Sequence, residues 1–392
     1  MTLAYEARER SSAEELEVVW VRTYGEDSHR EVRVSGSIRI DHTEVREYYL
    51  PAQLLRIRAN DLQDLRTGVR GRKEESLTSR DADGSGTLVT AVTNRQVKIR
   101  LASVRDAGAV ADLCGRTLDR TDTEDLPGLE RLLWEDPDSP ASMRLLAESE
   151  SRLVGCIFGS ARDYGDARGL TGFIKLLSVD PSARRHRIGS QLLGVLEREL
   201  FGLGVRSIWA GGSQPRYWWP GVDRTNAAAT SFLTRCGYET ADEVVNMRVA
   251  LPVAPSHRTP PSDLITRRLT AADWASFSLW MGEMWGPAWQ DEVELTLRRE
   301  PVSCFVALEH DDFIGFAAYD TNRRGWFGPM GTSPRSQGKG VGELLLRKCL
   351  DDVGARRVPA CVIAWAGPRD FYRRTVGATV DREFVRCRKT AP

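Results

Sequence analysis

Three glycines within five residues are the feature of this sequence that most clearly predicts chemistry. They lie at positions 338, 340 and 342 of the segment 334–343, Pro-Arg-Ser-Gln-Gly-Lys-Gly-Val-Gly-Glu. The segment lies between a predicted strand and a Leu-rich predicted helix, so several backbone N–H groups can point into one small volume at the positive end of the helix dipole. Such a loop binds phosphate, and Lys339, Arg335 and Arg347 could add positive charge. We therefore predict a pyrophosphate-binding loop.

Two common phosphate-binding motifs do not fit this loop. A Walker loop needs Lys followed by Ser or Thr after its second Gly, and a dinucleotide fingerprint has Gly-x-Gly-x-x-Gly after the first strand of its fold. The run Gln337-Gly338-Lys339-Gly340-Val341-Gly342, preceded by Gly331-Thr332-Ser333-Pro334, instead resembles the signature Gln/Arg-x-x-Gly-x-Gly/Ala of the GNAT superfamily of N-acetyltransferases. The cofactor implied by this resemblance is acetyl-coenzyme A (acetyl-CoA).

The resemblance implies which residues hold acetyl-CoA. In that family the backbone amides of the loop hold the pyrophosphate, and the strand before the loop hydrogen-bonds the pantetheine arm. The thioester carbonyl lies near a main-chain amide of that strand, where a fixed N–H stabilises the oxyanion that amine attack creates. The implied residues are Met330, Gly331 and Thr332 for the pantetheine, and Gln337, Gly338, Lys339, Gly340, Val341, Gly342 and Glu343 for the phosphates.

A general acid is implied for the leaving thiolate. Many family members supply the proton from a Tyr in the helix after the fifth strand, and the segment 365–377 contains the Phe371-Tyr372 pair of that helix. Tyr372 is therefore the candidate general acid, a role that typically contributes about 10²- to 10⁴-fold in rate. The alternative is that Tyr372 only packs against coenzyme A.

The same resemblance places the region that binds the acceptor amine at the segment 283–289, Glu-Met-Trp-Gly-Pro-Ala-Trp. Trp285 and Trp289 are the candidate substrate-binding residues. Glu283 is a candidate catalytic base or amine anchor, because an alkylammonium of pKa about 10.4 must lose a proton before it attacks. Asp320 and proton transfer through water compete with Glu283 for this role.

The sequence contains an internal repeat, and the strands and helices of its two copies must position these residues. A strand, a turn and an Asp-capped helix are predicted in both copies, and an apolar hairpin follows in each. Each copy then has a strand, a Pro, a basic Gly-containing loop and a Leu-rich helix, with eight positions separating the Pro from the Gly that begins the helix. A further strand, a short helix and a last strand end each copy, and the last strands are predicted at 244–251 and 383–388.

The element order of both copies resembles the GNAT fold. The resemblance implies an α/β (α+β) fold with two tandem GNAT domains, each a mixed central sheet with flanking helices, an architecture similar to that of proteins of the mycothiol synthase type. We expect a degenerate GNAT domain at 96–251 (the first copy), a Pro-rich linker at 252–262 and a catalytic GNAT domain at 263–392 (the second copy). Residues 1–95 lie outside the repeat. They are expected to form a small β-rich module of unassigned role, with strands at 17–21, 32–40 and 48–57 and a mobile tether at 66–86.

The two copies are expected to differ in their roles in catalysis. Arg187 stands where the first Gly of the signature should be, and its Cβ can obstruct the close approach of a phosphate. Leu233 occupies the position of the Tyr in the first copy and cannot donate a proton. We therefore expect the second copy to be catalytic and the first to be structural or substrate-shaping. The basic loop 184–187 could still attract phosphate, so cofactor binding in the first copy stays open.

The first copy also carries an insertion at 211–223, which we call the aromatic loop. Its residues Tyr217, Trp218 and Trp219 are bounded by Pro and Gly. A rigid loop of this kind suits the face of a ring or a sugar. The alternative, which the sequence favours, is that the three rings fill the vacant cleft or the domain interface.

Composition limits the function classes. The chain has 392 residues, too many for one ordinary core, and 55 basic residues balance 55 acidic ones. This balance gives no whole-chain electrostatic reason to expect a nucleic-acid or membrane partner. No apolar stretch approaches the roughly 20 residues of a membrane span, and the amino terminus lacks the apolar segment of a signal peptide, so we expect a cytoplasmic protein. The seven cysteines are widely spaced, which predicts buried reduced thiols rather than disulfides or a metal site.

The sequence thus predicts a transferase that moves an acetyl or another small acyl group from coenzyme A to a primary amine by direct attack in a ternary complex. The expected acceptor is a small molecule such as an amino sugar, an amino acid derivative or an antibiotic, and the expected state is a monomer or homodimer. Two alternatives stay open. One is a non-catalytic acyl-CoA sensor or scaffold, and the other is a GNAT-fold enzyme with a different acyl-CoA reaction, such as decarboxylation.

Overall fold

The computed structural model describes residues 97–256 and 264–391 with their side chains, and the backbone of five earlier strands. The chain divides into two compact units, Met1–Ser76 and Leu77–Pro392. In the first unit, β1 (Leu16–Tyr24), β2 (Glu31–Ile40) and β3 (Thr43–Tyr49) form an antiparallel sheet. Two of the predicted strands are thereby confirmed, whereas residues 50–57 of the third, and most of the predicted tether, lie outside the described residues.

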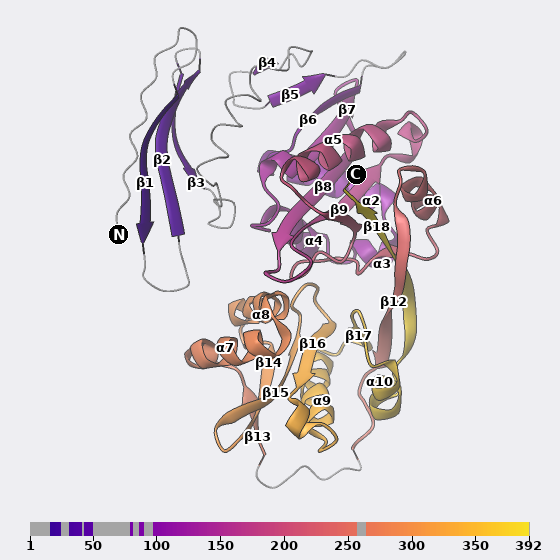
Figure 1. Cartoon of the computed structure of the whole chain (residues 1–392). Helices are drawn as coiled ribbons and strands as arrows, with labels where there is room; N and C mark the ends of the chain where they lie inside the picture. The colour runs from indigo at the N-terminus through magenta and orange to yellow at the C-terminus, as the bar shows by residue number, and fades with distance from the viewer. Residues whose placement is uncertain are drawn as a thin grey trace. The chain divides into compact units, whose positions relative to one another are not determined.

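One continuous mixed sheet runs through the second unit (Figure 1). The pairs β9–β10 and β16–β17 are parallel and the other pairs are antiparallel. The strands in spatial order are β13 (Ile265–Arg268), β14 (Cys304–Glu309), β15 (Asp312–Tyr319), β16 (Trp326–Thr332), β17 (Ala360–Ile363), β12 (Glu239–Ala250), β18 (Thr379–Thr390), β10 (Ser207–Ala210), β9 (Leu170–Val179), β8 (Arg152–Asp163), β7 (Arg144–Ser149), β6 (Val97–Leu101), β5 (Gly86–Val89) and β4 (Ser79–Arg80), and β11 (Val222–Asp223) pairs with β18.

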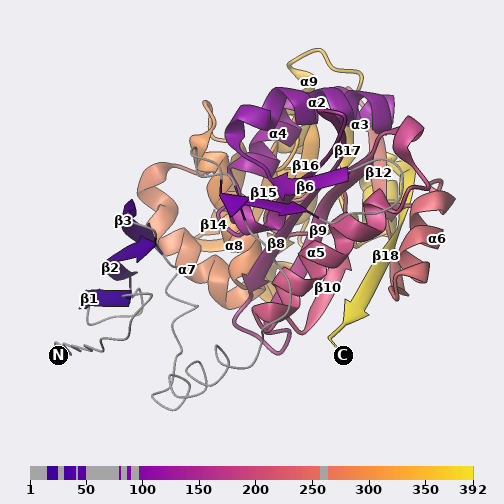
Figure 2. The ribbon, with the colours of Figure 1, turned by 90° about the horizontal axis from the view of Figure 1, so that it is seen from above.

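Helices flank this sheet in both copies (Figure 2). Asp106 and Asp273 lie at the N-cap positions of the first helices, as predicted, but their carboxylates complete the capping boxes of the short 3-10 turns before those helices, whose N-caps are Ser103 and Thr270. Such a box satisfies backbone N–H groups that the first helical turn leaves without partners. The helices are α2 (Ala107–Thr117), α3 (Arg120–Thr123), α4 (Leu126–Trp134), α5 (Ile188–Gly202) and α6 (Ala227–Arg235) in the first copy, and α7 (Trp274–Trp285), α8 (Pro287–Glu294), α9 (Val341–Gly354) and α10 (Arg369–Val376) in the second.

The last strands of the two copies are exchanged. β12, from the first copy, pairs with β17 of the second, while β18, from the second copy, pairs with β10 of the first. The two exchanged strands also pair with each other, and they run side by side in Figure 1. Their side chains follow the exchange: Val245 and Met247 of β12 are buried in the core of the second copy, and Cys387 of β18 in that of the first. Neither copy completes its sheet without the other.

The exchange predicts that cutting the polypeptide within residues 257–263 will not separate the two copies. Each fragment keeps a strand that belongs to the sheet of the other, and releasing it would expose buried apolar side chains to water. A protease site inserted there, followed by cleavage and size-exclusion chromatography, should give one particle that contains both fragments. Fragments that elute apart without denaturant would contradict the exchange.

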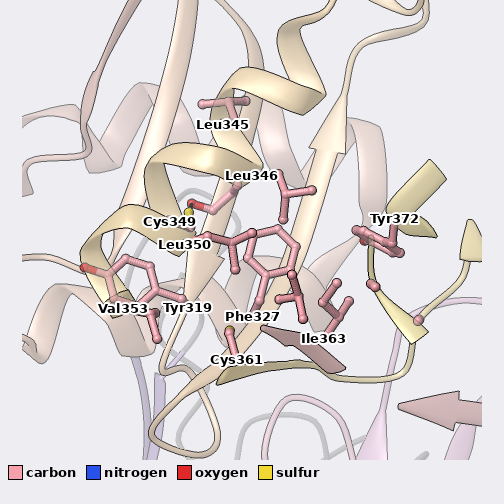
Figure 3. Close-up of a cluster of buried hydrophobic side chains, with 14 of the residues drawn as sticks. Tyr319, Phe327, Leu345, Leu346, Cys349, Leu350, Val353, Cys361, Ile363 and Tyr372 are labelled. Carbon is pink, nitrogen blue, oxygen red and sulfur yellow. Dashed lines mark hydrogen bonds between the residues drawn. The ribbon is translucent and has the colours of Figure 1, made fainter. Parts of the chain in front are cut away.

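The core of the second copy places α9 over the sheet. Leu345, Leu346, Cys349 and Leu350 of α9 pack against strand residues such as Phe327, and Tyr372 lies at one end of this cluster (Figure 3). All seven cysteines are unpaired; six are buried, as predicted, and Cys236 is half-buried. Among the described residues, no helix has the length and apolar character needed to cross a bilayer.

Candidate functional site

A cleft of about 1270 Å³ opens where β16 and β17 part, and we call it the main cleft. The two parallel strands pair only at Trp326–Val362 and Phe327–Ile363, and beyond that point they diverge. The cleft is lined by Gln214, Tyr217, Ala254, Pro255, Trp289, Glu292, Phe327, Gly328, Pro329, Met330, Gly331, Thr332, Ser336, Gln337, Gly338, Gly340, Val341, Gly342, Glu343, Arg347, Ala364, Trp365, Gly367, Pro368, Phe371, Tyr372, Arg373, Arg374, Thr375, Val376 and Gly377.

The edge of β16 presents backbone N–H groups to the main cleft. On its other edge β16 pairs with β15, and the N–H of Ser333 donates to the carbonyl of Ile314 at 2.8 Å. Successive residues of an antiparallel strand direct their N–H groups to opposite edges. The N–H groups of Met330 and Thr332 therefore point away from β15, toward the cleft, where β17 no longer pairs with them. A strand edge of this kind can hydrogen-bond an extended chain of amides.

The glycine loop leads into α9 at one end of the main cleft. Gly338 and Gly340 have φ angles of 77° and 87°, and Gly340 caps the helix. A Cβ at either position would meet no protein atom within 4 Å, so the space beside the loop is open. Positive φ values are rarely adopted by residues with a Cβ, and the helix dipole favours an anion at this end. The loop therefore fits a phosphate group.

The cations near this loop come from α9 and α10. Arg347 lines the main cleft and is held by Glu343 at 2.9 Å and by the carbonyl of Thr375 at 2.7 Å. Arg373 and Arg374 also line it and are exposed. Lys339 does not line the cleft, because its side chain turns toward Glu309, with Nζ and Oε1 3.7 Å apart.

Tyr372 lies on α10 at the boundary between the main cleft and the core. Its side chain is buried, and its ring meets that of Phe327 edge to face, with the centroids 6.2 Å apart. Burial raises the pKa of the Tyr372 phenol well above its usual value, so this group is protonated at neutral pH. Its hydroxyl has no hydrogen-bond partner among the described residues. Tyr372 can therefore donate a proton to a group in the cleft.

Glu292 on α8 is the carboxyl group buried in the wall of the main cleft. It is 2% exposed and accepts hydrogen bonds from Asn322 Nδ2 at 2.7 Å and Thr321 Oγ1 at 3.3 Å. Burial raises the pKa of Glu292 to about 8, although both hydrogen bonds favour the charged form. A carboxyl group that titrates near neutral pH is suited to act as a general base.

Comparison with known proteins identifies the fold. The model of the acetyltransferase (GNAT) family matches residues 116–238 and 267–377, which together make up more than half of the chain. The chain belongs to the GNAT acetyltransferase family. Both copies match, so the tandem arrangement of GNAT regions and the mixed α/β fold predicted from the sequence are confirmed.

Solved structures show the same fold at low sequence identity. A GCN5-related glucosamine N-acetyltransferase region of a fungal multi-domain GH3 β-N-acetylglucosaminidase superimposes with a TM-score of 0.64 at 15% identity, over 76% of this chain and 39% of that one. A GCN5-related N-acetyltransferase from Sphaerobacter thermophilus gives 0.57 at 18% identity, over 75% and 95%. A tandem GNAT protein from the clavulanic acid biosynthesis pathway gives 0.57 at 16% identity, over 76% and 99%. No curated protein matches.

In both GNAT copies the two parallel strands, β9 and β10 or β16 and β17, diverge at the same point, but the clefts between them differ in size. The N–H of Gly211 donates to the carbonyl of Ile174 at 3.0 Å, and that of Ala364 donates to Phe327 at 3.1 Å, just before each pair diverges. The first copy, however, has a cleft of only about 200 Å³ at this point, the small cleft. A separate cavity of about 670 Å³ lies beside the basic loop of the first copy and is lined by Arg185, His186 and Arg187. Of the two clefts that open between parted strands, the main cleft is the one large enough for coenzyme A.

The structure brings most of the sequence-predicted residues into the main cleft, but not all. Trp289 lines it, together with every implied cofactor-binding residue except Lys339. Trp285 instead packs behind β16, where a Cβ on Gly331 would come within 2.5 Å of its ring. Glu283 does not reach the cleft either, because it is exposed on α7. Asp320, the competing carboxylate, is ion-paired with Arg356.

Sequence reasoning missed Glu292, and it left the aromatic loop without a definite place. The signal for Glu292 was its spacing, since it lies three residues after Trp289 on α8 and thus near the same face of that helix. The aromatic loop serves both clefts: Tyr217 lines the main cleft, and Trp219 lines the small cleft. Tyr217 therefore lies where the two copies meet, against Trp326 and Trp365, and faces the candidate site, whereas Trp218 is buried in a core of the first copy.

Proposed function

We propose that this protein is an acetyl-CoA-dependent N-acetyltransferase that transfers an acetyl, or another small acyl group, to a primary amine of a small molecule by direct attack in a ternary complex. The observation that carries the proposal is the composition of the main cleft. One cavity combines a loop suited to phosphate, an unpaired strand edge, a buried carboxyl group that titrates near pH 8 and a buried phenol.

The residues of the main cleft fit acetyl-CoA along its length. The loop from Gln337 to Glu343 would hold the phosphates, without the side chain of Lys339 and with Arg347 nearby. The free edge of β16, from Met330 to Thr332, would hydrogen-bond the pantetheine arm. When bound, acetyl-CoA supplies the acetyl group as an activated thioester.

Three groups of this chain then have distinct tasks. Glu292 in its charged form takes a proton from the ammonium of the acceptor, which leaves the amine free to attack. The N–H of Met330 donates to the carbonyl oxygen on which negative charge develops, and it needs no reorganisation because the sheet fixes it. Tyr372 gives its proton to the departing sulfur, and the second proton that the amine nitrogen loses as the amide forms returns to Tyr372. The proton on Glu292 is returned to water when product leaves.

The experiment that tests this function measures free thiol released from acetyl-CoA in the presence of a panel of primary amines. Release that depends on the amine supports the enzyme. Tight binding of acetyl-CoA without release for any amine would instead favour the sensor or scaffold, and release without an acceptor would favour a different acyl-CoA reaction. The small-molecule partner, the lack of a nucleic-acid or membrane partner, the monomeric or homodimeric state and the cytoplasmic location stay predictions.

Replacing Tyr372 by phenylalanine should lower kcat about 100-fold and leave the KM for acetyl-CoA nearly unchanged. The ring, which packs on Phe327, is kept, and only the proton donor is lost. Steady-state kinetics with the best amine of the panel would measure this. Tyr238→Phe is a matched control, because Tyr238 is a buried tyrosine that lines neither cleft. A kcat for Tyr372→Phe within threefold of the wild type would show that Tyr372 only packs against the cofactor.

A further inference from the structure

The aromatic loop of the first copy forms part of the main cleft in the second. Gln214 and Tyr217 are the residues of this loop that line the cavity, together with Glu292 and Trp289 of α8. The second copy has only a short connection between β17 and α10, where the first copy has its insertion. The first copy thus contributes a wall to the main cleft of the second. The inference below rests on the function proposed above.

The aromatic loop is fixed from both sides. The indole N–H of Trp218 donates to the carbonyl of Asp122 at 3.3 Å, and the hydroxyl of Tyr164 donates to the carbonyl of Gln214 at 3.0 Å. From the second copy, the guanidinium of Arg323 lies 4.7 Å from the centre of the Trp218 ring. The loop is therefore a preformed wall, which does not have to be ordered when a ligand binds.

A buried amide connects Tyr217 to Glu292. The backbone N–H of Tyr217 donates to Asn322 Oδ1 at 3.1 Å, and Asn322 Nδ2 donates to Glu292 at 2.7 Å. All three residues are at most 9% exposed. The ring of Tyr217 meets that of Trp365 edge to face at 5.5 Å, and its hydroxyl has no hydrogen-bond partner among the described residues. Glu292 is thus held beside an aromatic wall from the other copy.

Glu292 lacks a counter-ion within the described part of the chain. No Lys, Arg or His there pairs with it, although buried charges in proteins are normally paired. The cations that line the main cleft, Arg347, Arg373 and Arg374, all belong to α9 and α10, on the side of the glycine loop. A ligand cation beside Glu292 would supply the opposite charge, and the aromatic rings of Tyr217 and Trp289 line the same cavity.

We infer that the acceptor is a primary amine with a flat, apolar body and no acidic group beside the amine, bound where the two copies meet. Its ammonium lies at Glu292, and its body lies against Tyr217 and Trp289. A carboxylate next to the amine would face Glu292 with no cation to neutralise it. Above pH 8, where Glu292 is charged, two like charges about 5 Å apart at an effective dielectric constant of about 20 repel enough to lower affinity more than about 100-fold.

The test uses matched amines with the full-length protein. Phenethylamine is compared with phenylalanine, tryptamine with tryptophan, and glucosamine serves as a polar ring. At pH 9, where Glu292 is charged, we measure kcat/KM for each, and we also measure binding by calorimetry in the presence of coenzyme A. The two arylalkylamines should exceed the matching amino acids by about 100-fold or more in both measurements, and glucosamine should be weaker than the arylalkylamines. Equal use of the amino acids, or a preference for glucosamine, would overturn the inference.

Two leucine variants test the contribution of the aromatic loop. Tyr217→Leu should raise the KM for tryptamine about tenfold and change that for acetyl-CoA less than twofold. Trp219→Leu, an equivalent change in the same loop at the small cleft, should change neither. An unchanged amine KM in Tyr217→Leu, or an equal rise for both substrates, would overturn the assignment of Tyr217.

The two measurements separate the inference from the proposed function. Arylalkylamines that bind with the expected preference but are not acetylated would support the inferred acceptor class and contradict the proposed acetyltransferase function. Acetylation of the amines without that preference would support the proposed function and contradict the inferred acceptor class. If no amine binds and none is acetylated, both are wrong.

Discussion

Replacing Glu292 with glutamine is expected to lower kcat about 100- to 10,000-fold, the range usual for loss of a general base. Glutamine keeps the size of the side chain and can still accept the hydrogen bonds from Asn322 and Thr321, but it cannot take a proton. In the wild type, kcat should rise as the pH is raised through about 8 and then level off, because Glu292 must be charged. The residual activity of Glu292→Gln should lack this dependence.

The same substitution should stabilise the protein at alkaline pH. Folding raises the pKa of Glu292 from 4.5 to about 8. Below pH 4.5 both the folded and the unfolded forms hold the proton, so the raised pKa has no cost. Between pH 4.5 and 8 the unfolded form loses its proton while the folded form keeps it, and the free energy of unfolding falls, in total by up to about 5 kcal/mol. Glutamine does not titrate, so the free energy of unfolding of Glu292→Gln should not show this fall.

The matched control for Glu292→Gln is Glu283→Gln. The chemical change is the same, but Glu283 is exposed on α7 and does not line the main cleft. It should change neither kcat nor the pH dependence of stability. Steady-state kinetics and thermal unfolding at pH 5 and pH 8 measure both effects. If Glu292→Gln is within tenfold of the wild type in kcat, Glu292 is not the base. If its stability relative to the wild type is the same at both pH values, the pKa of Glu292 is not raised.

Gly340→Asp is expected to weaken the binding of acetyl-CoA at least about 100-fold. Gly340 has a φ of 87°, which costs a residue with a Cβ roughly 1–2 kcal/mol. The larger effect comes from the carboxylate, which would occupy the open space beside the loop and repel the phosphates. Calorimetric titration with acetyl-CoA measures the affinity.

The chain contains its own control for this variant. Arg187 occupies the corresponding position in the first copy with a φ of 61°, so this loop conformation tolerates a side chain and Gly340→Asp should fold. Arg187→Asp should leave the affinity of the main cleft unchanged, because Arg187 lines a separate cavity beside the loop of the first copy and not the main cleft. The wild type should bind one acetyl-CoA per chain. Equal losses in the two variants, or two bound molecules per chain, would show that the first copy also holds the cofactor.

Much of the fold and of the cofactor side of the site could be predicted because it depends on local sequence. The glycines at 338 and 340 suit the positive φ angles of the loop, and the family signature around them indicates its use. The Asp residues at the helix starts and the strand before the loop recur at fixed spacings in both copies, and the Tyr of α10 follows its strand at the spacing of the family. In each of these cases neighbouring residues determine the conformation, so the pattern indicates the structure directly.

The acceptor side depends on contacts between distant segments, and there the sequence was insufficient. Helical spacing places Glu292 near Trp289, but it does not show that Glu292 is buried while Glu283 is exposed, because burial depends on the loop that carries Asn322. The exchange of β12 and β18 was equally hidden, since alternation along a strand predicts its faces and not its partner. Tyr217 reaches the main cleft only as a result of how the two copies pack.

The most direct measurement is the fate of the acetyl group. The protein is incubated with acetyl-CoA carrying an isotopic label in the acetyl group, together with the amine panel, and the products are identified by mass spectrometry. We expect the label in one amine product, in an amount equal to the thiol released, and we expect Gly340→Asp but not Arg187→Asp to abolish it. Acetyl-CoA that binds and keeps its label with every amine, or a product that depends on Arg187 instead, would contradict the assignment of acyl transfer to the second copy.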